Sequence, residues 1–365
     1  MDKFSLELNQ KVQTRQLLQG RLTAAKWIAL TEPEVAREVV GLESDELFRE
    51  LLHGTQGNVP IIKRKRWPAS SLHSGFYELH EEIASHPGSA GVEDLLEKKG
   101  DLIGLIQRIG RGAFEKYFLY GEEGIPLSKI CQRLGISEQE GRQILDLTLE
   151  VGARSEFFRP PSASQTSGIR LHCIARIQQD ARDPENIYFQ FISPHWARGR
   201  YEVLYDRLET WKKQRGLSKE EKSKLRHILK NIELLNMRQD TLFQILSRIT
   251  TVQSAFLLSR LKHRRRPLSL RELARRIGVA PSTVSRAAGT RSVQLPWDEE
   301  VPLKNLMTGQ RMVVFSILSY WQQQGDLSPQ ITDEKLMRRL ADDFGISVSR
   351  RTINAIRHIL PNHSS

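Results

Sequence analysis

Apolar residues recur every three to four positions along most of the chain, which is the spacing of one face of an α-helix. The clearest example is the stretch 198–261, where an apolar face at 225–235 is followed by a second one at 242–249. A helix with one apolar face buries that face against neighbouring elements. The pattern therefore predicts a mainly α fold made of several helical domains.

Two short apolar runs, at 171–177 and 187–192, depart from this helical spacing. The sequence Asp-Pro-Glu-Asn at 183–186 lies between them and is typical of a turn. Apolar runs of this length on either side of a turn predict a small β-hairpin. Elsewhere in the chain we expect little strand.

Composition indicates where the domains begin and end. Residues 54–74 contain glycine, proline and a strongly basic run at 63–66, which predicts a solvated linker. The Pro- and Ser-rich stretch 159–167 marks another break in the pattern. We therefore divide the chain into a helical N-terminal region (1–53), a basic linker (54–74), a helical region (75–235), a central helix-turn-helix domain (236–305) and a small C-terminal three-helix domain (306–365).

Residues 268–289 (LSLRELARRIGVAPSTVSRAAG) carry the residue types that a helix-turn-helix needs at fixed offsets. Ala274 is small where two helices approach, Gly278 permits the positive φ of the turn, and Pro281 suits the first turn of the second helix. A looser outline of the same motif spans 126–151. In DNA-binding units of this kind the second helix enters the major groove. Its candidate contact residues here are Ser282, Thr283, Ser285 and Arg286.

Positive charge concentrates around this motif. The chain has a net charge of +12, and residues 260–291 hold ten Lys or Arg residues and one acid, Glu272. Lys and Arg bind nucleic acid chiefly by neutralising phosphates, which positions a protein on DNA without reading the sequence. A helix-turn-helix can also serve only for packing or for protein binding, but the basic tract favours DNA. The candidate phosphate contacts are Arg264, Arg265 and Arg266.

A second segment near the C-terminus has the same order of apolar stretch, glycine and helix start. Gly345 follows an apolar stretch, and Ser347 or Ser349 can cap the helix that comes next. An exposed arginine pair at the start of such a helix suits guanine, whose O6 and N7 accept both hydrogens of a guanidinium fork. The alternative is an ordinary basic helix face. The candidate DNA-contact residues are Ser349, Arg350, Arg351, Thr352, Asn354 and Arg357.

Sequence signatures of catalysis and of cofactor or metal binding are absent. The sequence has no phosphate loop, Cys-x-x-Cys pair, His-Glu-x-x-His or Gly-x-Ser-x-Gly motif. We therefore expect no cofactor, no metal and no enzymatic activity, although dispersed acidic residues leave a nucleic-acid-processing enzyme as an alternative. Cys131 and Cys173 each lie in an apolar stretch, which is typical of small buried side chains in a reducing compartment. No run reaches the ~18 apolar residues of a membrane span, so we expect a cytoplasmic protein with no membrane partner.

The helix start at 350–353 and the helix-turn-helix at 266–286 together resemble one family, the sigma-54 factors that direct bacterial RNA polymerase to promoters. Residues 350–353 and Arg357 are similar to the family's C-terminal promoter box, Ala-Arg-Arg-Thr-Val-Ala-Lys-Tyr-Arg. Here Ser349 replaces the first Ala, and Asn-Ala-Ile at 354–356 replaces Ala-Lys-Tyr. The sequence Arg-Gln-Asp-Thr-Leu at 238–242 resembles the start of the family's long helix.

The resemblance implies a function for each region. Arg350 and Arg351 would contact the GG of the upstream (minus-24) promoter element, and the central helix-turn-helix would lie near the downstream (minus-12) element. Residues 75–235 would bind core RNA polymerase, and an enhancer-binding activator ATPase would remodel the N-terminal region. Residues 1–52 share only scattered Leu and Gln with that region of the family. The alternative is a sigma-54-like DNA-binding regulator or decoy without productive polymerase engagement.

Overall fold

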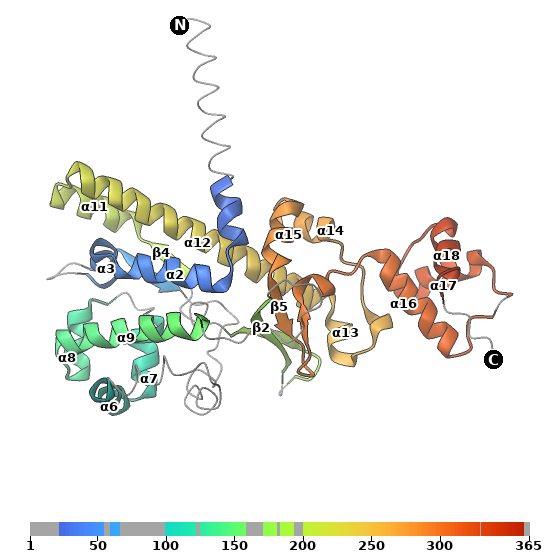
Figure 1. Ribbon diagram of the computed structural model, residues 1–365, viewed down its shortest axis with the longest axis horizontal. Helices are drawn as coiled ribbons and strands as arrows, with labels where there is room; N and C mark the ends of the chain where they lie inside the picture. The colour runs from blue at the N-terminus through green and yellow to red at the C-terminus, as the bar shows by residue number, and fades with distance from the viewer. Residues whose placement is uncertain are drawn as a thin grey trace, which may run out of the picture.

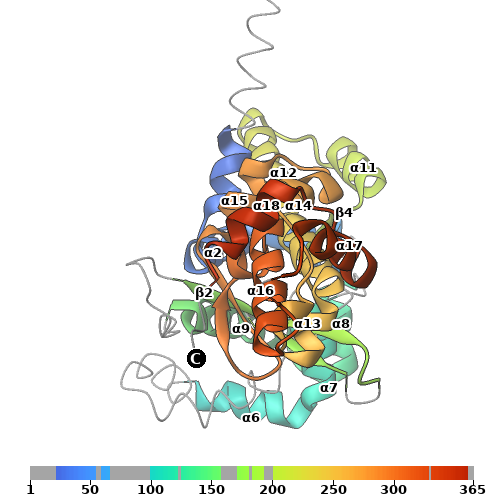
Figure 2. The same ribbon diagram turned by 90° about the vertical axis from the view of Figure 1, so that its right-hand side faces the viewer.

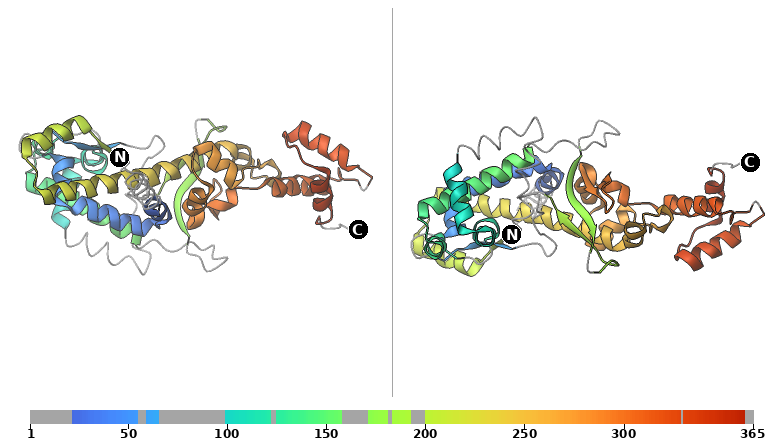
Figure 3. Two further views of the ribbon diagram at one scale, coloured as in Figure 1. Left: turned by 90° about the horizontal axis from the view of Figure 1, so that it is seen from above. Right: turned by 90° about the horizontal axis from the view of Figure 1, so that it is seen from below.

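The computed structural model of this 365-residue chain describes residues 22–54, 59–65, 99–121, 125–157, 171–180, 183–192, 200–328 and 330–360. Over these residues the molecule is elongated and mainly helical, as predicted (Figure 1). One long helix, α12 (Lys219–Val252), runs from the N-terminal half into the middle of the molecule. The C-terminal helices form a separate unit at the far end (Figure 3). The described strands form a two-stranded and a four-stranded sheet.

The N-terminal body packs around the first half of α12. Its helices are one over 22–29, α2 (Glu32–Ser44), α3 (Glu46–His53) and α11 (Tyr205–Arg215). The apolar face predicted at 225–235 is buried in one cluster with Phe48, Leu51 and Trp211. The first of the two predicted faces of α12 is therefore covered by the N-terminal region.

A second helical cluster lies beside this body. Its elements are α6 (Gly100–Ile109), α7 (Arg111–Ala113), the π-helix η2 (Phe114–Tyr120), α8 (Leu127–Leu134) and α9 (Glu138–Phe157). Gly135 has a φ of 65° at the end of α8, so the helix-turn-helix outline predicted at 126–151 is confirmed. Phe118, Ile130 and Ile144 belong to its core, and α9 packs on α2. The cluster and the N-terminal body are thus joined.

The four-stranded sheet brings distant parts of the sequence together. β2 (His172–Gln179) and β3 (Ile187–Phe191) pair antiparallel, which confirms the predicted hairpin. β5 (Arg291–Gln294) pairs parallel with β2, and β6 (Glu300–Pro302) pairs antiparallel with β5. These last two strands were not predicted, because they are short and the first pairs with a strand far away in the sequence. The sheet packs on the second half of α12, where the face at 242–249 is buried.

The basic run at 63–66 differs from the solvated linker that its composition predicts. Ile62–Lys65 form β1, which pairs antiparallel with β4 (Arg200–Val203). Arg64 is buried, and its Nη2 donates to Glu43 Oε1 at 2.9 Å. The linker prediction was therefore wrong for 62–65. The sequence pattern showed the charges of the run but not the buried carboxylate that neutralises one of them.

A capping box closes the N-terminus of α12. The Ser218 hydroxyl accepts a hydrogen bond from Glu221 N at 3.1 Å, and the Glu221 carboxylate accepts one from Ser218 N at 2.9 Å. We expect Ser218→Ala to lower the free energy of unfolding by about 1 kcal/mol, the usual cost of losing such a cap. Urea denaturation followed by circular dichroism measures this, with Ser223→Ala on the exposed face of α12 as the control. Equal stability of the two variants would contradict the prediction.

Candidate nucleic-acid interface

The predicted central helix-turn-helix is confirmed. α14 (Leu270–Ile277) ends at Gly278, whose φ of 72° makes the turn, and α15 (Pro281–Gly289) begins with the proline that was expected there. Ala274 and Val284 are buried in the core that the two helices share. The geometry of this unit therefore follows from local sequence.

The outer face of α15 carries the residues predicted to contact DNA. Ser282 and Arg286 are exposed, and Thr283 and Ser285 are half-buried. The opposite face of α15 is buried through Val284 and two alanines. Small hydroxyl side chains and one arginine on an exposed helix face can approach the edges of base pairs. Figures 1 and 2 show both α15 and α18, the latter in the C-terminal unit, toward the upper side of the molecule.

The basic segment before α14 contains two kinds of arginine. It begins with the short helix η3 (Lys262–Arg264), and Arg264 and Arg266 are exposed, as a phosphate contact requires. The Arg265 guanidinium instead lies 4.2 Å from the centre of the Phe256 ring, and its Nε is buried without a hydrogen-bond partner in the described part of the chain. Burial lowers the pKa of Arg265. We infer that Arg265 anchors the segment, whereas its two neighbours remain available at the surface.

Two arginines of α14 hold the one acid of the basic tract. Arg275 donates to both carboxylate oxygens of Glu272, at 3.1 and 2.8 Å, and Arg276 donates to it at 2.8 Å. The hydrogen bonds from Arg275, and then those from Arg276, lower the pKa of Glu272 to about 2. The carboxylate therefore stays ionised and offsets part of the positive charge, but the surface of α14 keeps a net positive field.

The C-terminal unit is a domain of three helices, as predicted. α16 (Gln310–Gln323), α17 (Asp333–Phe344) and α18 (Arg350–Arg357) face the viewer in Figure 2. Ile317, Leu340 and Ile353 belong to their shared core. Gly345 ends α17 with a φ of 65°, and the Ser349 hydroxyl accepts a hydrogen bond from Thr352 N at 3.3 Å. The predicted cap and the predicted start of α18 are confirmed.

Most candidate residues of α18 lie at the surface. Ser349, Arg350, Arg351 and Asn354 are exposed, and Thr352 is half-buried. The Arg350 Nη1 lies 3.0 Å from Glu334 Oε1, so this ion pair must open before the side chain can reach a base. Within the part of the chain that the structure describes, Arg351 makes no ion pair. Arg351 is therefore the arginine of the pair that is already available for a ligand.

Arg357 lies differently from the other candidates. Its Nη1 donates to Asp333 Oδ1 and to Ile331 O, both at 2.9 Å, and 28% of the side chain is exposed. Asp333 is the first residue of α17, so the contact fixes α18 against the start of that helix. We infer that Arg357 positions α18, and its predicted contact with DNA stays a prediction. The spacing of the promoter box could not show this, because the partner lies on another helix.

A buried charged cluster, which the sequence did not predict, ties the N-terminal region to the helix-turn-helix domain. Glu32 of α2 accepts hydrogen bonds from Arg238 Nη2 of α12 at 2.5 Å and from Arg291 Nε of β5 at 2.9 Å. These side chains, named here the Glu32 cluster, are at most 2% exposed. Arg291 also donates to Leu30 O at 2.6 Å and to Ala287 O of α15. Arg238 belongs to the motif at 238–242, but its partner is 206 positions away.

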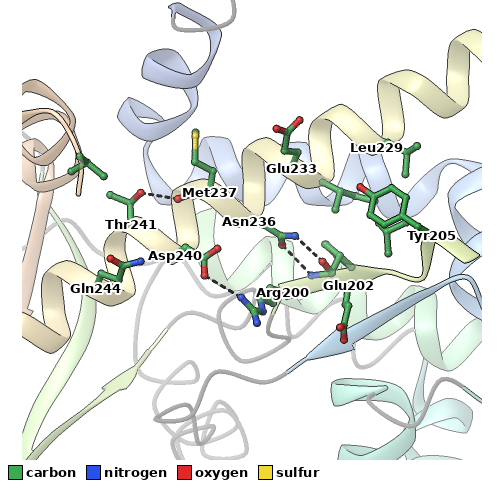
Figure 4. A pocket seen from close by; sticks show the side chains of 14 residues that line it. Arg200, Glu202, Tyr205, Leu229, Glu233, Asn236, Met237, Asp240, Thr241 and Gln244 are labelled. Carbon is green, nitrogen blue, oxygen red and sulfur yellow. Dashed lines mark hydrogen bonds and ion pairs between the residues drawn. The ribbon is translucent and has the colours of Figure 1, made fainter. Parts of the chain in front are cut away.

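A hollow of about 590 Å³ lies between β4 and α12 (Figure 4). The Asn236 side chain donates to Tyr201 O at 2.7 Å and accepts from Tyr201 N at 3.1 Å, so its amide covers the outer edge of β4 as a further strand would. Arg200 of β4 pairs with Asp240 of α12 at 3.4 Å. These polar side chains hold β4 on α12, and we therefore assign the hollow to the junction between the N-terminal body and the DNA-binding domain.

The described residues contain neither a candidate metal site nor a candidate membrane span. Among them, no group of three or more His, Cys, Asp or Glu side chains could hold a metal ion. In the same residues, no helix is both long and apolar enough to cross a bilayer. Cys131 and Cys173 are free thiols, the first buried and the second half-buried, so the expected burial is confirmed for Cys131.

The central and C-terminal domains match a known family. The family model described as "Sigma-54, DNA binding domain" matches residues 218–365. The RNA polymerase sigma-54 factor of Bacillus subtilis (strain 168) is 28% identical over 132 residues, which are 34% of this chain and 30% of that protein. The crystal structure of Aquifex aeolicus sigmaN bound to promoter DNA covers 64% of this chain and 85% of its own, with 15% identity and a TM-score of 0.34. A TM-score this low supports no argument about the fold.

The fold and the exposed basic helices define a helix-turn-helix protein. Its second helical domain likewise has a helix that ends at a glycine of positive φ and is followed by an exposed basic helix. Residues 218–365 are similar to the DNA-binding domain of the sigma-54 family. The matched region contains all of α12, the helix-turn-helix and the three-helix domain. The shared segment spans 30% of the Bacillus relative.

Proposed function

We propose that this chain is a sigma-54-like transcription initiation factor. It binds core RNA polymerase and directs the enzyme to bipartite promoters of the GG/GC (minus-24/minus-12) type. In this proposal the chain catalyses no reaction, and promoter opening depends on an enhancer-binding activator ATPase. It acts in the cytoplasm, where polymerase and promoter DNA meet.

The observation that carries the proposal is the presence of two different exposed reading helices in one chain. α15 presents three hydroxyl-bearing residues and Arg286, while α18 presents Arg350 and Arg351. The two helices belong to separate cores, so each can meet its own DNA element. A helix-turn-helix repressor reads repeated half-sites with one helix from each protomer. Two unlike readers at a fixed separation favour a bipartite promoter.

The arrangement of the other helices supports a protein partner. The cluster of α6 to α9 has a core of its own and lies at the opposite end of the molecule from α18 (Figures 1 and 3). An elongated chain of this shape can hold DNA at one end while its other end contacts polymerase. The resemblance assigns polymerase binding to residues 75–235, which include this cluster.

A mobility-shift experiment tests the proposal. The purified chain is mixed with a GG/GC promoter duplex, with and without core RNA polymerase. We expect the chain to retard the duplex and the polymerase to retard it further, and we expect neither effect on a duplex whose GG is replaced. Retardation by the chain without any further shift would refute polymerase binding. No retardation at all would refute promoter recognition.

A sigma-54-like DNA-binding regulator or decoy is the second candidate. The Glu32 cluster favours it, because three charged side chains buried together hold the start of α2 in the DNA-binding domain. The N-terminal region therefore serves as part of a folded core there. An activator that remodels this region would have to break those contacts. The further shift with polymerase, described above, separates the two candidates.

Arg264→Ala is expected to weaken binding to every DNA sequence by a similar factor. Arg264 is exposed in the basic segment, and a lost phosphate contact lowers the slope of log K against log salt concentration by about 0.9. Titration of promoter and random duplexes at several salt concentrations measures both effects. Lys213→Ala, an exposed substitution on α11, is the control. A loss confined to the promoter duplex would show that Arg264 reads bases.

A further inference from the structure

Three side chains connect the two domains that carry the reading helices. Gln253 is the C-cap of α12, His263 lies in η3 within the basic segment, and Tyr320 lies on α16 of the three-helix domain. These residues are named here the domain joint. Figure 1 shows α13 (Ser254–Ser259), which follows Gln253, beside α16, and η3 packs on both helices.

Gln253 fixes the two segments that lead away from the helix-turn-helix core. Its side chain is fully buried, and its Oε1 accepts a hydrogen bond from Arg266 N at 3.0 Å. Its Nε2 donates to Arg266 O at 2.9 Å and to Leu306 O at 3.2 Å. Leu306 ends the turn η4 (Leu303–Leu306), shortly before α16 begins. A buried amide whose donors and acceptor are used in this way holds its neighbours in one arrangement.

Two further contacts cross between the domains. The rings of His263 and Tyr320 are stacked, with centroids 3.7 Å apart and planes inclined by 22°. Leu268 N, just before α14, donates to Thr308 O at 2.8 Å, just before α16. The contacts thus fix α16 relative to α14 and to the basic segment on either side of His263.

We propose that the domain joint sets the spacing between the two DNA elements that the chain accepts, with His263 and Tyr320 as positioning residues. The inference rests on the proposed function, because it needs two elements read by two helices. One added base pair moves the second element by about 3.4 Å along the axis and turns it by about 35°. A fixed joint cannot follow this displacement, so one helix loses its base contacts at a wrong spacing.

The experiment compares Tyr320→Ala with Tyr320→Phe, because phenylalanine keeps a ring for the stack at the same position. Binding is measured on promoter duplexes whose two elements are separated by the best spacing or by one or two base pairs more or fewer. For the unaltered chain and for Tyr320→Phe we expect a preference of about tenfold or more for the best spacing, the worth of one good base contact. For Tyr320→Ala we expect that preference to fall to about threefold or less. Its binding to duplexes with only one element should not change.

Each outcome decides a stated point. A wild-type preference retained in Tyr320→Ala refutes the inference, and so does a wild-type chain that binds both elements at any spacing. A chain that binds neither element refutes the proposed function itself. If circular dichroism shows that Tyr320→Ala does not fold, His263→Ala is used with the same expectations. Adding His263→Ala to Tyr320→Ala should cause no further loss, because the two residues form one contact.

A measurement without DNA tests the joint independently. Spin labels are placed at exposed positions outside the proposed contacts, through Ala280→Cys and Asp342→Cys, in a chain whose Cys131 and Cys173 are replaced. We expect a narrow distribution of label-to-label distances with Tyr320 or with phenylalanine there, and a broader one in Tyr320→Ala. Equal widths in all three proteins would overturn the inference whatever the DNA results.

Discussion

Glu32→Ala is expected to lower the free energy of unfolding by about 3–5 kcal/mol, the usual cost of removing one partner from a buried ion pair. The Glu32 carboxylate lies between two guanidinium groups, those of Arg238 and Arg291, which are 0% and 1% exposed. Water cannot replace the lost acid there without opening the core. The substitution therefore leaves two positive charges close together in a region where both are poorly screened.

Urea denaturation followed by circular dichroism measures this loss. Glu38→Ala is the matched control, because Glu38 is an exposed acid on the same helix, and we expect its effect to stay within about 0.5 kcal/mol. Glu32→Gln keeps the shape and removes the charge, so it should also destabilise the chain. Hydrogen exchange should rise both in α2 and in α15, because Arg291 contacts both. A Glu32→Ala chain as stable as the Glu38→Ala control would show that the cluster contributes nothing.

The elements that could be predicted from the sequence are those whose causes lie within a few residues. Gly278 and Pro281 specify the turn and the next helix start of the helix-turn-helix by their own backbone preferences. Ser349 caps α18 because its hydroxyl reaches an amide three residues on. The hairpin of β2 and β3 follows from two apolar runs around one turn. Each of these features is caused by residues within a short segment, so the sequence of that segment is enough to predict it.

The features that could not be predicted all depend on a distant partner. Arg64 was expected to be solvated, but it pairs with the buried Glu43, and Arg357 pairs with Asp333 of another helix, a contact that the promoter box does not indicate. The sequence shows that a residue is charged, but it does not show which distant residue will form an ion pair with it. The strand β5 was not predicted for the same reason. It pairs parallel with β2, and parallel strands are not joined by a short turn that the sequence could show. The Glu32 cluster and the domain joint are contacts of this distant kind, and both connect regions that composition alone had separated.

Arg351→Ala is expected to remove about 1–3 kcal/mol of discrimination at one guanine of the upstream element, or about a five- to 150-fold change in the ratio of affinities. The side chain is exposed in the first turn of α18, where the Ser349 cap holds the helix start in place. Arg350→Ala should act in the same direction at the neighbouring guanine. Its net effect should be smaller, because Arg350 must first leave Glu334, 3.0 Å away.

The measurement is a competition between promoter duplexes that differ at a single guanine, repeated for each variant. Arg338→Ala is the matched control, because it removes an exposed arginine from α17 of the same domain and so tests for a simple loss of charge. If Arg351 reads a base, its variant binds the original and the altered duplex almost equally, while the control keeps the wild-type preference. If Arg351 only contacts phosphate, Arg351→Ala weakens binding to the original and the altered duplex by the same factor, and α18 would be a positioning helix and not a reader.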